Sequence, residues 1–177
     1  MKHIYKFIFQ FLLLCITVII FSCHNADLKS LQITSDKNQS VKTSNNCDYN
    51  LWAHVYNPDR LKIIDTCKMV TGTITESNAD DDGDQHMLLK LDPGEENLLT
   101  PANTVHKNGC LVIEAICVNN ISRNKVGDAC EGFLNNVDLP RLNQHVKVFG
   151  SYVIDSHNGW AEIHPISSID LIKNKNE

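Results

Sequence analysis

The stretch that decides the fold is residues 145–166, which read HVKVFGSYVIDSHNGWAEIHPI. Apolar and polar residues alternate on both sides of Asn158-Gly159, a dipeptide that favours a two-residue type I′ turn because both residues accept positive φ. We therefore expect two antiparallel strands with Asp155 opposite Glu162, so that alternate pairs point to opposite sides of the sheet. In this register one face of the hairpin collects a group of polar and aromatic side chains, namely Asp155, His157, Trp160, Glu162 and His164.

This polar face is a candidate site because two carboxylates that face each other repel unless a positive group lies beside them. Histidine and carboxylate ligands on adjacent strands can hold Zn²⁺ or Mn²⁺, so Asp155, His157, Glu162 and His164 form a candidate metal set. The same side chains can instead form a self-satisfied surface network in which the imidazoles share protons with the acids. Both interpretations remain open.

Three further residues extend the candidate site. We expect Trp160 either to pack over the polar cluster or to offer a stacking platform for a ligand. Asp84 and His86 share one face of a predicted strand, and they join the cluster if that strand lies beside the hairpin. Because we expect the last strand to pair with the first, this proximity stays open.

Three strands are predicted before the hairpin. Over residues 70–75 apolar residues alternate with threonines, and Gly72 within this run indicates a bulge or bend. A second strand covers residues 84–92, after a loop rich in aspartate. The third strand, residues 110–117, is apolar on both faces apart from Glu114, as expected for a covered strand.

The spacing of apolar residues predicts one short helix over residues 125–135, between the third and fourth strands. The order is then strand, strand, strand, short helix, strand, strand. Together with the bent first strand and the Val146-x-Val148-x-Gly150 pattern in the fourth, this order resembles the OB-fold, a five-stranded Greek-key barrel. We therefore predict a mainly β fold, with an OB-like barrel domain over residues 47–177 that begins with an N-terminal arm.

Three short motifs add a second resemblance. They are Cys67-x-x-Val70-x-Gly72, Asp82-Gly83-Asp84-x-His86 and Gly159-Trp160-x-Glu162-Ile163-His164-Pro165. In this order they resemble the motifs of an uncharacterised group of secreted bacterial lipoproteins with an OB-like fold. The resemblance implies the fold and an extracytoplasmic location, and it implies no activity.

The N-terminal segment has the features of a secretory signal. Within residues 1–22, Lys2 and Lys6 precede an apolar run shorter than the about 20 residues that a membrane-spanning helix needs. The segment ends Ser22-Cys23, which resembles the lipobox of bacterial lipoproteins. We therefore expect Cys23 to be lipidated and to anchor the chain to membrane lipid in the cell envelope, with simple secretion or an uncleaved anchor as alternatives.

Residues 23–46 are polar and contain no aromatic residue, which predicts a disordered tether between the lipid and the domain. The whole chain has 16 basic and 21 acidic residues and a formal net charge of −5. It has no basic stripe that could neutralise phosphates, so we do not expect nucleic acid as a partner.

The cysteine content agrees with an oxidising compartment, since the chain has 7 cysteines, five of them outside the leader and the lipidation site. An odd number leaves one thiol unpaired, and we expect this to be Cys110, inside an apolar strand. Without a Cys-x-x-Cys pair, a cysteine-based zinc site is not favoured. The preferred disulfides tie the third strand to the short helix and pin the N-terminal arm, namely Cys117–Cys130 and Cys47–Cys67.

These observations predict a membrane-anchored extracytoplasmic binding or structural module. Its ligand surface is the polar face around Trp160, and its partner is a small ligand or an envelope protein. The alternative is a hydrolase in which Asp155, His157, Glu162 and His164 hold a metal that lowers the pKa of a bound water. A third hypothesis, a subunit of an envelope complex, predicts an exposed apolar patch.

Overall fold

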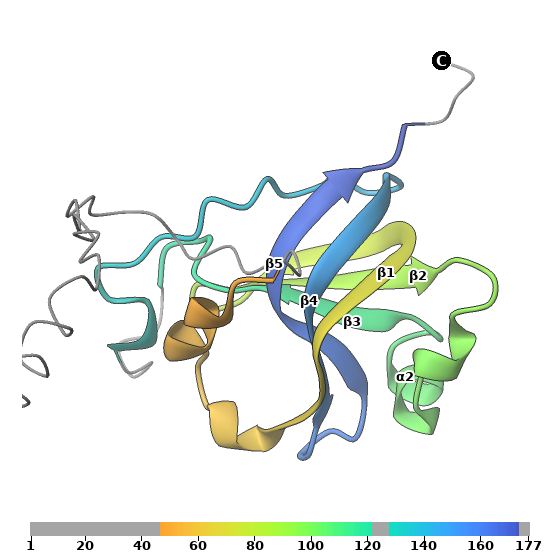
Figure 1. Cartoon of the computed structure of the whole chain (residues 1–177), viewed down its shortest axis with the longest axis horizontal. Coiled ribbons are helices and arrows are strands. Elements are labelled where there is room, and N and C mark those ends of the chain that lie inside the picture. Colours follow the sequence, from red (N-terminus) through yellow and green to blue (C-terminus); the bar gives the residue numbers. More distant parts are fainter. Residues whose placement is uncertain (1–46, 122–127, 174–177) are drawn as a thin grey trace, which may run out of the picture. The chain divides into compact units, whose positions relative to one another are not determined.

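Five strands close on themselves in the computed structural model (Figure 1), which describes residues 47–121 and 128–173. Around the closed sheet the order is β1-β2-β3-β5-β4, with β3 and β5 parallel and the other neighbours antiparallel. This confirms the predicted mainly β, OB-like fold class. The predictions for the signal peptide, Cys23 and the tether lie outside the described residues. The strands are β1 (Leu61–Ala79), β2 (Gln85–Leu91), β3 (Leu111–Ala115), β4 (His145–Asp155) and β5 (Ala161–Leu171).

The longest strand, β1, begins earlier than predicted, because residues 61–65 of the expected N-terminal arm already pair with β4. The second half of β1 pairs with β2, so one strand closes the sheet on both sides. At the crossover Gly72 pairs with both Leu91 and Val146. A Cβ atom on Gly72 would lie 2.3 Å from the carbonyl oxygen of Lys90, so the close approach of the two strands requires glycine here.

The predicted neighbour of the last strand is wrong. We expected the last strand to lie beside the first, whereas β5 pairs with β3 and β4 pairs with β1. Sequence patterns identify strands but do not determine which distant strands pair, and here the parallel pair joins residues about 50 positions apart. This pairing sets the composition of the site described below.

Short helical turns connect the strands, and within the described residues none is long and apolar enough to cross a membrane. One of them, α2, was not predicted. It begins with a capping box in which Thr100 Oγ1 accepts a hydrogen bond from the Asn103 N–H and Asn103 Oδ1 accepts one from the Thr100 N–H. The turns are η1 (Tyr49–His54), η2 (Pro58–Arg60), η3 (Glu96–Leu98), α2 (Pro101–His106) and η4 (Asp128–Cys130).

The helix predicted over residues 125–135 is present, within the described residues, only as the turn η4; residues 122–127 lie outside that part. Residues 131–135 are not helical. Gly132 has a φ of +70°, which ends a right-handed helix. The N–H of Asn135 donates instead to the carbonyl oxygen of Cys117, so this segment runs back alongside the end of β3.

The interior of the sheet is an apolar core. Its side chains alternate along the strands with outward-facing ones, as the period of two requires, and burying each large one contributes about 1.5 to 3 kcal/mol. The fully buried members are Val70, Ile74, Met87, Leu89, Leu111, Ile113, Ala115, Val146, Val148, Ala161, Ile163 and Ile166.

Both predicted disulfides are present, Cys47–Cys67 and Cys117–Cys130. The remaining described cysteine, Cys110, is free and buried, as predicted. A second apolar cluster, in which Leu51 and Val55 of the arm contact Ile116 and Val153, surrounds the Cys117–Cys130 bridge. The arm is thereby fixed against the outside of the sheet, near the ends of β3 and β4.

Candidate functional site

The connection between β4 and β5 differs from the predicted hairpin. Val153 pairs with Glu162, so Asp155 does not lie opposite Glu162. Residues 156–159 form a four-residue loop, closed by hydrogen bonds from the Gly159 N–H to the Asp155 carbonyl (2.7 Å) and from the Asp155 N–H to the Trp160 carbonyl (3.0 Å). Only Gly159 of the Asn158-Gly159 dipeptide has a positive φ, whereas a type I′ turn needs two. The predicted two-residue turn is therefore wrong.

The side chain of Asp155 explains the longer loop. Its carboxylate accepts hydrogen bonds from the backbone N–H groups of His157 (2.7 Å) and Asn158 (3.1 Å) and from the Asn158 side chain (2.7 Å), an Asx-type arrangement that stabilises the turn. It also forms an ion pair with Arg60, at the end of η2. Burial alone would raise the pKa of Asp155, but these hydrogen bonds and the guanidinium outweigh it and lower that pKa.

Parallel pairing of β3 with β5 brings a residue to the site that the sequence analysis did not select. Val112 pairs with Glu162 and Ile113 with Ile163, which places Glu114 beside His164. In the sequence, Glu114 stands out only as the polar exception in an apolar strand. That exception was the available signal, because a carboxylate in a strand covered on both faces requires a partner.

His164 and Glu114 form a buried ion pair. His164 Nδ1 lies 2.6 Å from Glu114 Oε2 and 3.2 Å from Glu162 Oε2, and the His164 side chain is 1% exposed. Burial alone would lower the pKa of His164, but the two carboxylates raise it to about 10. Burial alone would raise the pKa of Glu114. The neighbouring cationic groups outweigh this effect, His164 most strongly and then His86 and Arg60, and they lower the pKa of Glu114 to about 2.

Arg60 connects this pair to the β4–β5 loop. Its guanidinium contacts Asp155, and its Nη2 lies 3.9 Å from Glu114 Oε2. Two cationic side chains therefore face three carboxylates on the outer side of the sheet, where the third acid, Glu162, also accepts a hydrogen bond from the Trp160 indole N–H. We call Arg60, Glu114, Asp155, Glu162 and His164 the charged cluster.

Three partly exposed side chains border the charged cluster, and we call His86, Lys107 and Trp160 the rim. His86 Nε2 lies 4.0 Å from Glu114 Oε1. Lys107 Nζ lies 3.4 Å from His86 Nε2 and 3.9 Å from the centre of the Trp160 ring. The rim therefore combines an ammonium, an imidazole and an indole above buried charges. We expected Trp160 either to pack over the polar cluster or to offer a stacking platform, and its hydrogen bond to Glu162 fits the first of these.

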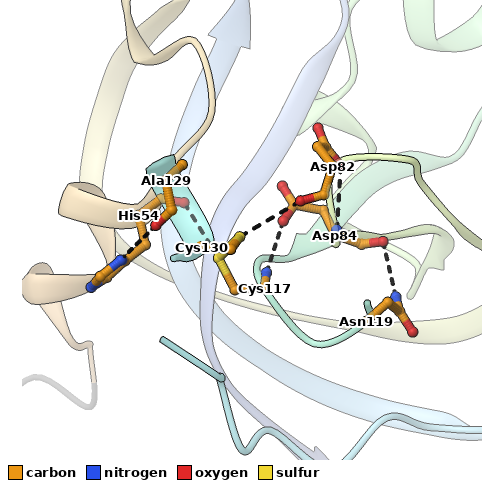
Figure 2. The surroundings of a disulfide bond; sticks show 7 residues. All are labelled: His54, Asp82, Asp84, Cys117, Asn119, Ala129 and Cys130. Atoms are coloured by element: carbon orange, nitrogen blue, oxygen red, sulfur yellow. Dashed lines mark hydrogen bonds between the residues drawn. A yellow bond between two sulfur atoms is a disulfide. The ribbon is translucent and has the colours of Figure 1, made fainter. Parts of the chain in front are cut away.

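Asp84 lies next to the Cys117–Cys130 disulfide, as Figure 2 shows. Its Oδ1 accepts a hydrogen bond from the Cys117 N–H (2.8 Å), and its carbonyl oxygen accepts one from the Asn119 side chain (3.0 Å). Burial raises the pKa of Asp84 to about 7, and the Cys117 N–H opposes this shift.

The predicted metal set of Asp155, His157, Glu162 and His164 is not gathered at one point. Glu162 and His164 contact each other, but Asp155 is held by the loop and Arg60, and His157 is exposed at the loop tip. Within the described part of the chain, two groups of His, Cys, Asp or Glu side chains are close enough to share one ion: Asp84–Glu114–His164 and Asp84–Cys117–Cys130. In the second group both sulfur atoms belong to a disulfide, so they cannot act as thiolate ligands.

Comparisons with known proteins add no assignment, because no known family and no curated protein matches this sequence. An OB-like strand order is shared by proteins of many functions, so the fold alone does not identify an activity. The charged cluster, the rim and Asp84 are therefore the features from which a function can be inferred.

Proposed function

We propose that this chain is a membrane-anchored extracytoplasmic module that binds a small polar ligand on the outer face of β2, β3 and β5. The observation that carries this proposal is the position of the rim. His86, Lys107 and Trp160 are partly exposed, whereas Glu114, Glu162 and His164 beneath them are buried and paired with one another. The rim is therefore the part of this site that a ligand reaches.

The chemistry of the rim favours a ligand that carries an anionic group and a ring or apolar part. The Lys107 ammonium and the His86 imidazole can donate hydrogen bonds to a carboxylate or phosphate. The Trp160 ring packs on an apolar cluster and lies under Lys107, and its partly exposed part can contact the ring or apolar part of the ligand. The hydrogen bond from its N–H to Glu162 fixes its orientation. The buried pairs below hold these groups in place, which lowers the entropic cost of binding.

Small anions test this ligand surface. In full-length protein labelled with ¹⁵N, we expect citrate and inorganic phosphate to shift the Trp160 indole resonance until it saturates. Lys107→Ala should abolish the shift. Lys147→Ala is the matched control, because Lys147 Nζ lies over a different aromatic ring, that of Phe149, at 5.5 Å. If neither anion shifts the Trp160 resonance at millimolar concentration, the rim is not an anion-binding surface.

The location rests on the sequence features of the first 23 residues, and two disulfides in the domain support it, because disulfides persist in oxidising compartments. We expect the chain to incorporate labelled palmitate and to fractionate with membranes. Cys23→Ala should prevent both, whereas Cys15→Ala should change neither. A Cys23→Ala variant that still carries labelled lipid would contradict the anchor.

The alternative, a metal-dependent hydrolase, has less support than a binding module. A catalytic metal keeps an open position for water, and the predicted ligands divide between a loop turn, an exposed tip and a buried pair. We therefore assign no catalytic residue. An envelope protein remains a candidate partner only through the same rim, where an acidic side chain of the partner would take the place of the small anion.

A further inference from the structure

We propose that Asp84, Glu114 and His164 form a binding site for one divalent cation, with Zn²⁺ as the best fit. One carboxylate oxygen from each acid and one ring nitrogen of His164 lie within 4.8 Å of one another. The three residues come from the start of β2, from β3 and from β5, so a bound cation would join three neighbouring strands. The site is separate from the rim and goes beyond the proposed ligand binding.

A second observation points to a ligand at this place. His164 Nε2 is buried and has no hydrogen-bond partner, one of two such side-chain atoms in the described part of the chain. The other ring nitrogen, Nδ1, is already held by Glu114 and Glu162. A buried polar atom without a partner is unfavourable, and a cation on Nε2 would satisfy it.

The surroundings of Nδ1 also fit a metal-binding histidine. An imidazole that binds a metal through one nitrogen usually donates the N–H of its other nitrogen to a carboxylate, which fixes the ring orientation and makes the ligand more basic. Glu162, which is fully buried, is placed to accept this hydrogen bond. On cation binding Glu162 would keep the hydrogen bond from Nδ1–H, and Glu114 would leave Nδ1 and place one carboxylate oxygen on the cation.

Most of the negative charge at the site is compensated when the cation binds. Cation binding places the lone pair of His164 Nε2 and the carboxylate of Asp84 on the metal, so any protons that they carry pass to solvent. The two charges of the cation then compensate Asp84 and Glu114, while Glu162 keeps its charge and accepts hydrogen bonds from His164 Nδ1–H and the Trp160 indole N–H. Arg60 already compensates Asp155.

The ligand set selects among cations. One imidazole and two carboxylates suit Zn²⁺, which binds nitrogen and oxygen ligands at about 2.0 to 2.2 Å. Mg²⁺ prefers oxygen ligands and keeps several waters. The three residues are 3%, 6% and 1% exposed, which leaves little room for a hydrated ion.

Direct metal binding tests the site. Full-length protein is stripped with a chelator, and Zn²⁺ is titrated calorimetrically. We expect one Zn²⁺ per chain in the wild type and an affinity lower by about 100-fold or more in Asp84→Asn, since even the loss of a partner behind a metal ligand costs 10- to 100-fold. The unliganded variant should keep the wild-type melting temperature, because an amide matches a carboxyl group in shape and its oxygen still accepts from the Cys117 N–H.

Asp170→Asn is the matched control for adventitious binding. Asp170 is an exposed acid on β5, 3.3 Å from Lys147, and its loss should leave Zn²⁺ affinity unchanged. Zinc X-ray absorption of the wild type gives an independent measurement that needs no variant: one imidazole and only nitrogen or oxygen neighbours support the site.

Two results would overturn the proposal. Either the wild type binds no Zn²⁺ more tightly than Asp84→Asn does, or the absorption spectrum shows more than one imidazole, as exposed histidines would give. Lys107→Ala separates this proposal from the ligand surface, because it should bind Zn²⁺ normally while losing the anion response.

Discussion

His164 contacts Glu114 on the neighbouring strand β3 and His145 contacts Asp92 just after β2, but the surroundings of the two pairs differ. His164 lies 2.6 Å from Glu114 and both side chains are buried, whereas His145 Nε2 lies 2.8 Å from Asp92 with the two side chains 31% and 36% exposed. Water and salt screen an exposed pair, so it contributes little. A buried pair is costly to break, because removing one partner leaves the other charge in the interior. The two pairs therefore have similar distances but are expected to contribute very differently to stability.

The largest expected effect comes from breaking the buried pair. His164→Ala should lower the free energy of unfolding by about 3 to 5 kcal/mol, because Glu114 and Glu162 are left close together without their cation. Urea unfolding in the presence of a chelator measures this change without a contribution from bound metal. A loss below about 1 kcal/mol would show that the buried pair behaves like an exposed one.

The next effect concerns the disulfide that borders the buried region. Cys117 and Cys130 are 13 positions apart, and replacing both with serine should lower the free energy of unfolding by about 3 kcal/mol through the greater freedom of the unfolded chain. Thermal unfolding with and without reductant provides the measurement. If reduction of the wild type leaves its melting temperature unchanged, the bridge does not constrain the domain.

A smaller effect is expected at Asp155, where charge and loop structure are combined. Asp155→Asn should lower the free energy of unfolding by about 1.5 to 3 kcal/mol at pH 7, because the charge-assisted hydrogen bond to Arg60 is removed. The pKa of Asp155 is lowered by folding, so its contribution is present above the unfolded pKa of about 3.9 and is lost as the pH falls through the folded value. The difference between wild type and variant should therefore narrow below pH 4, as acid titrations of stability can show.

The smallest effect is expected at the exposed pair. His145→Ala should change the free energy of unfolding by less than about 1 kcal/mol, and the change should shrink further in 1 M salt. The same urea titration at two salt concentrations measures both values. A loss as large as that of His164→Ala would remove the distinction between the two regions.

Much of the fold follows from local sequence patterns. The alternation of apolar residues in residues 84–92 and 145–166 is a short-range property, so the strands there were predicted within a few residues of their positions. The two disulfides were predicted as well. Cys110 stands in an apolar run that suits a buried free thiol, which leaves the other four cysteines of the domain to form two pairs. Helix α2 could have been predicted from Thr100-Pro101 followed by Asn103, a helix-start pattern in the loop before β3.

The candidate site was less predictable, because it depends on long-range pairing. Glu114 meets His164 only through the parallel contact of β3 with β5, and Arg60 arrives from a turn before the first strand. The error at Asn158-Gly159 has a local cause: Asp155 accepts hydrogen bonds from the next residues and favours a longer loop. The turn preference of the Asn-Gly dipeptide takes no account of hydrogen bonds to a nearby side chain such as that of Asp155.

The parallel pairing of β3 with β5 also bears on the order of folding. Glu114 precedes His164 by 50 residues in the chain, so its carboxylate remains hydrated while only the strands β1, β2 and β3 have associated. The Glu114 carboxylate loses its water only when β5 docks against β3, and the same step brings the His164 cation next to it. Association of the first three strands alone would therefore not bury a lone acid, and the closing of the sheet should be strongly cooperative.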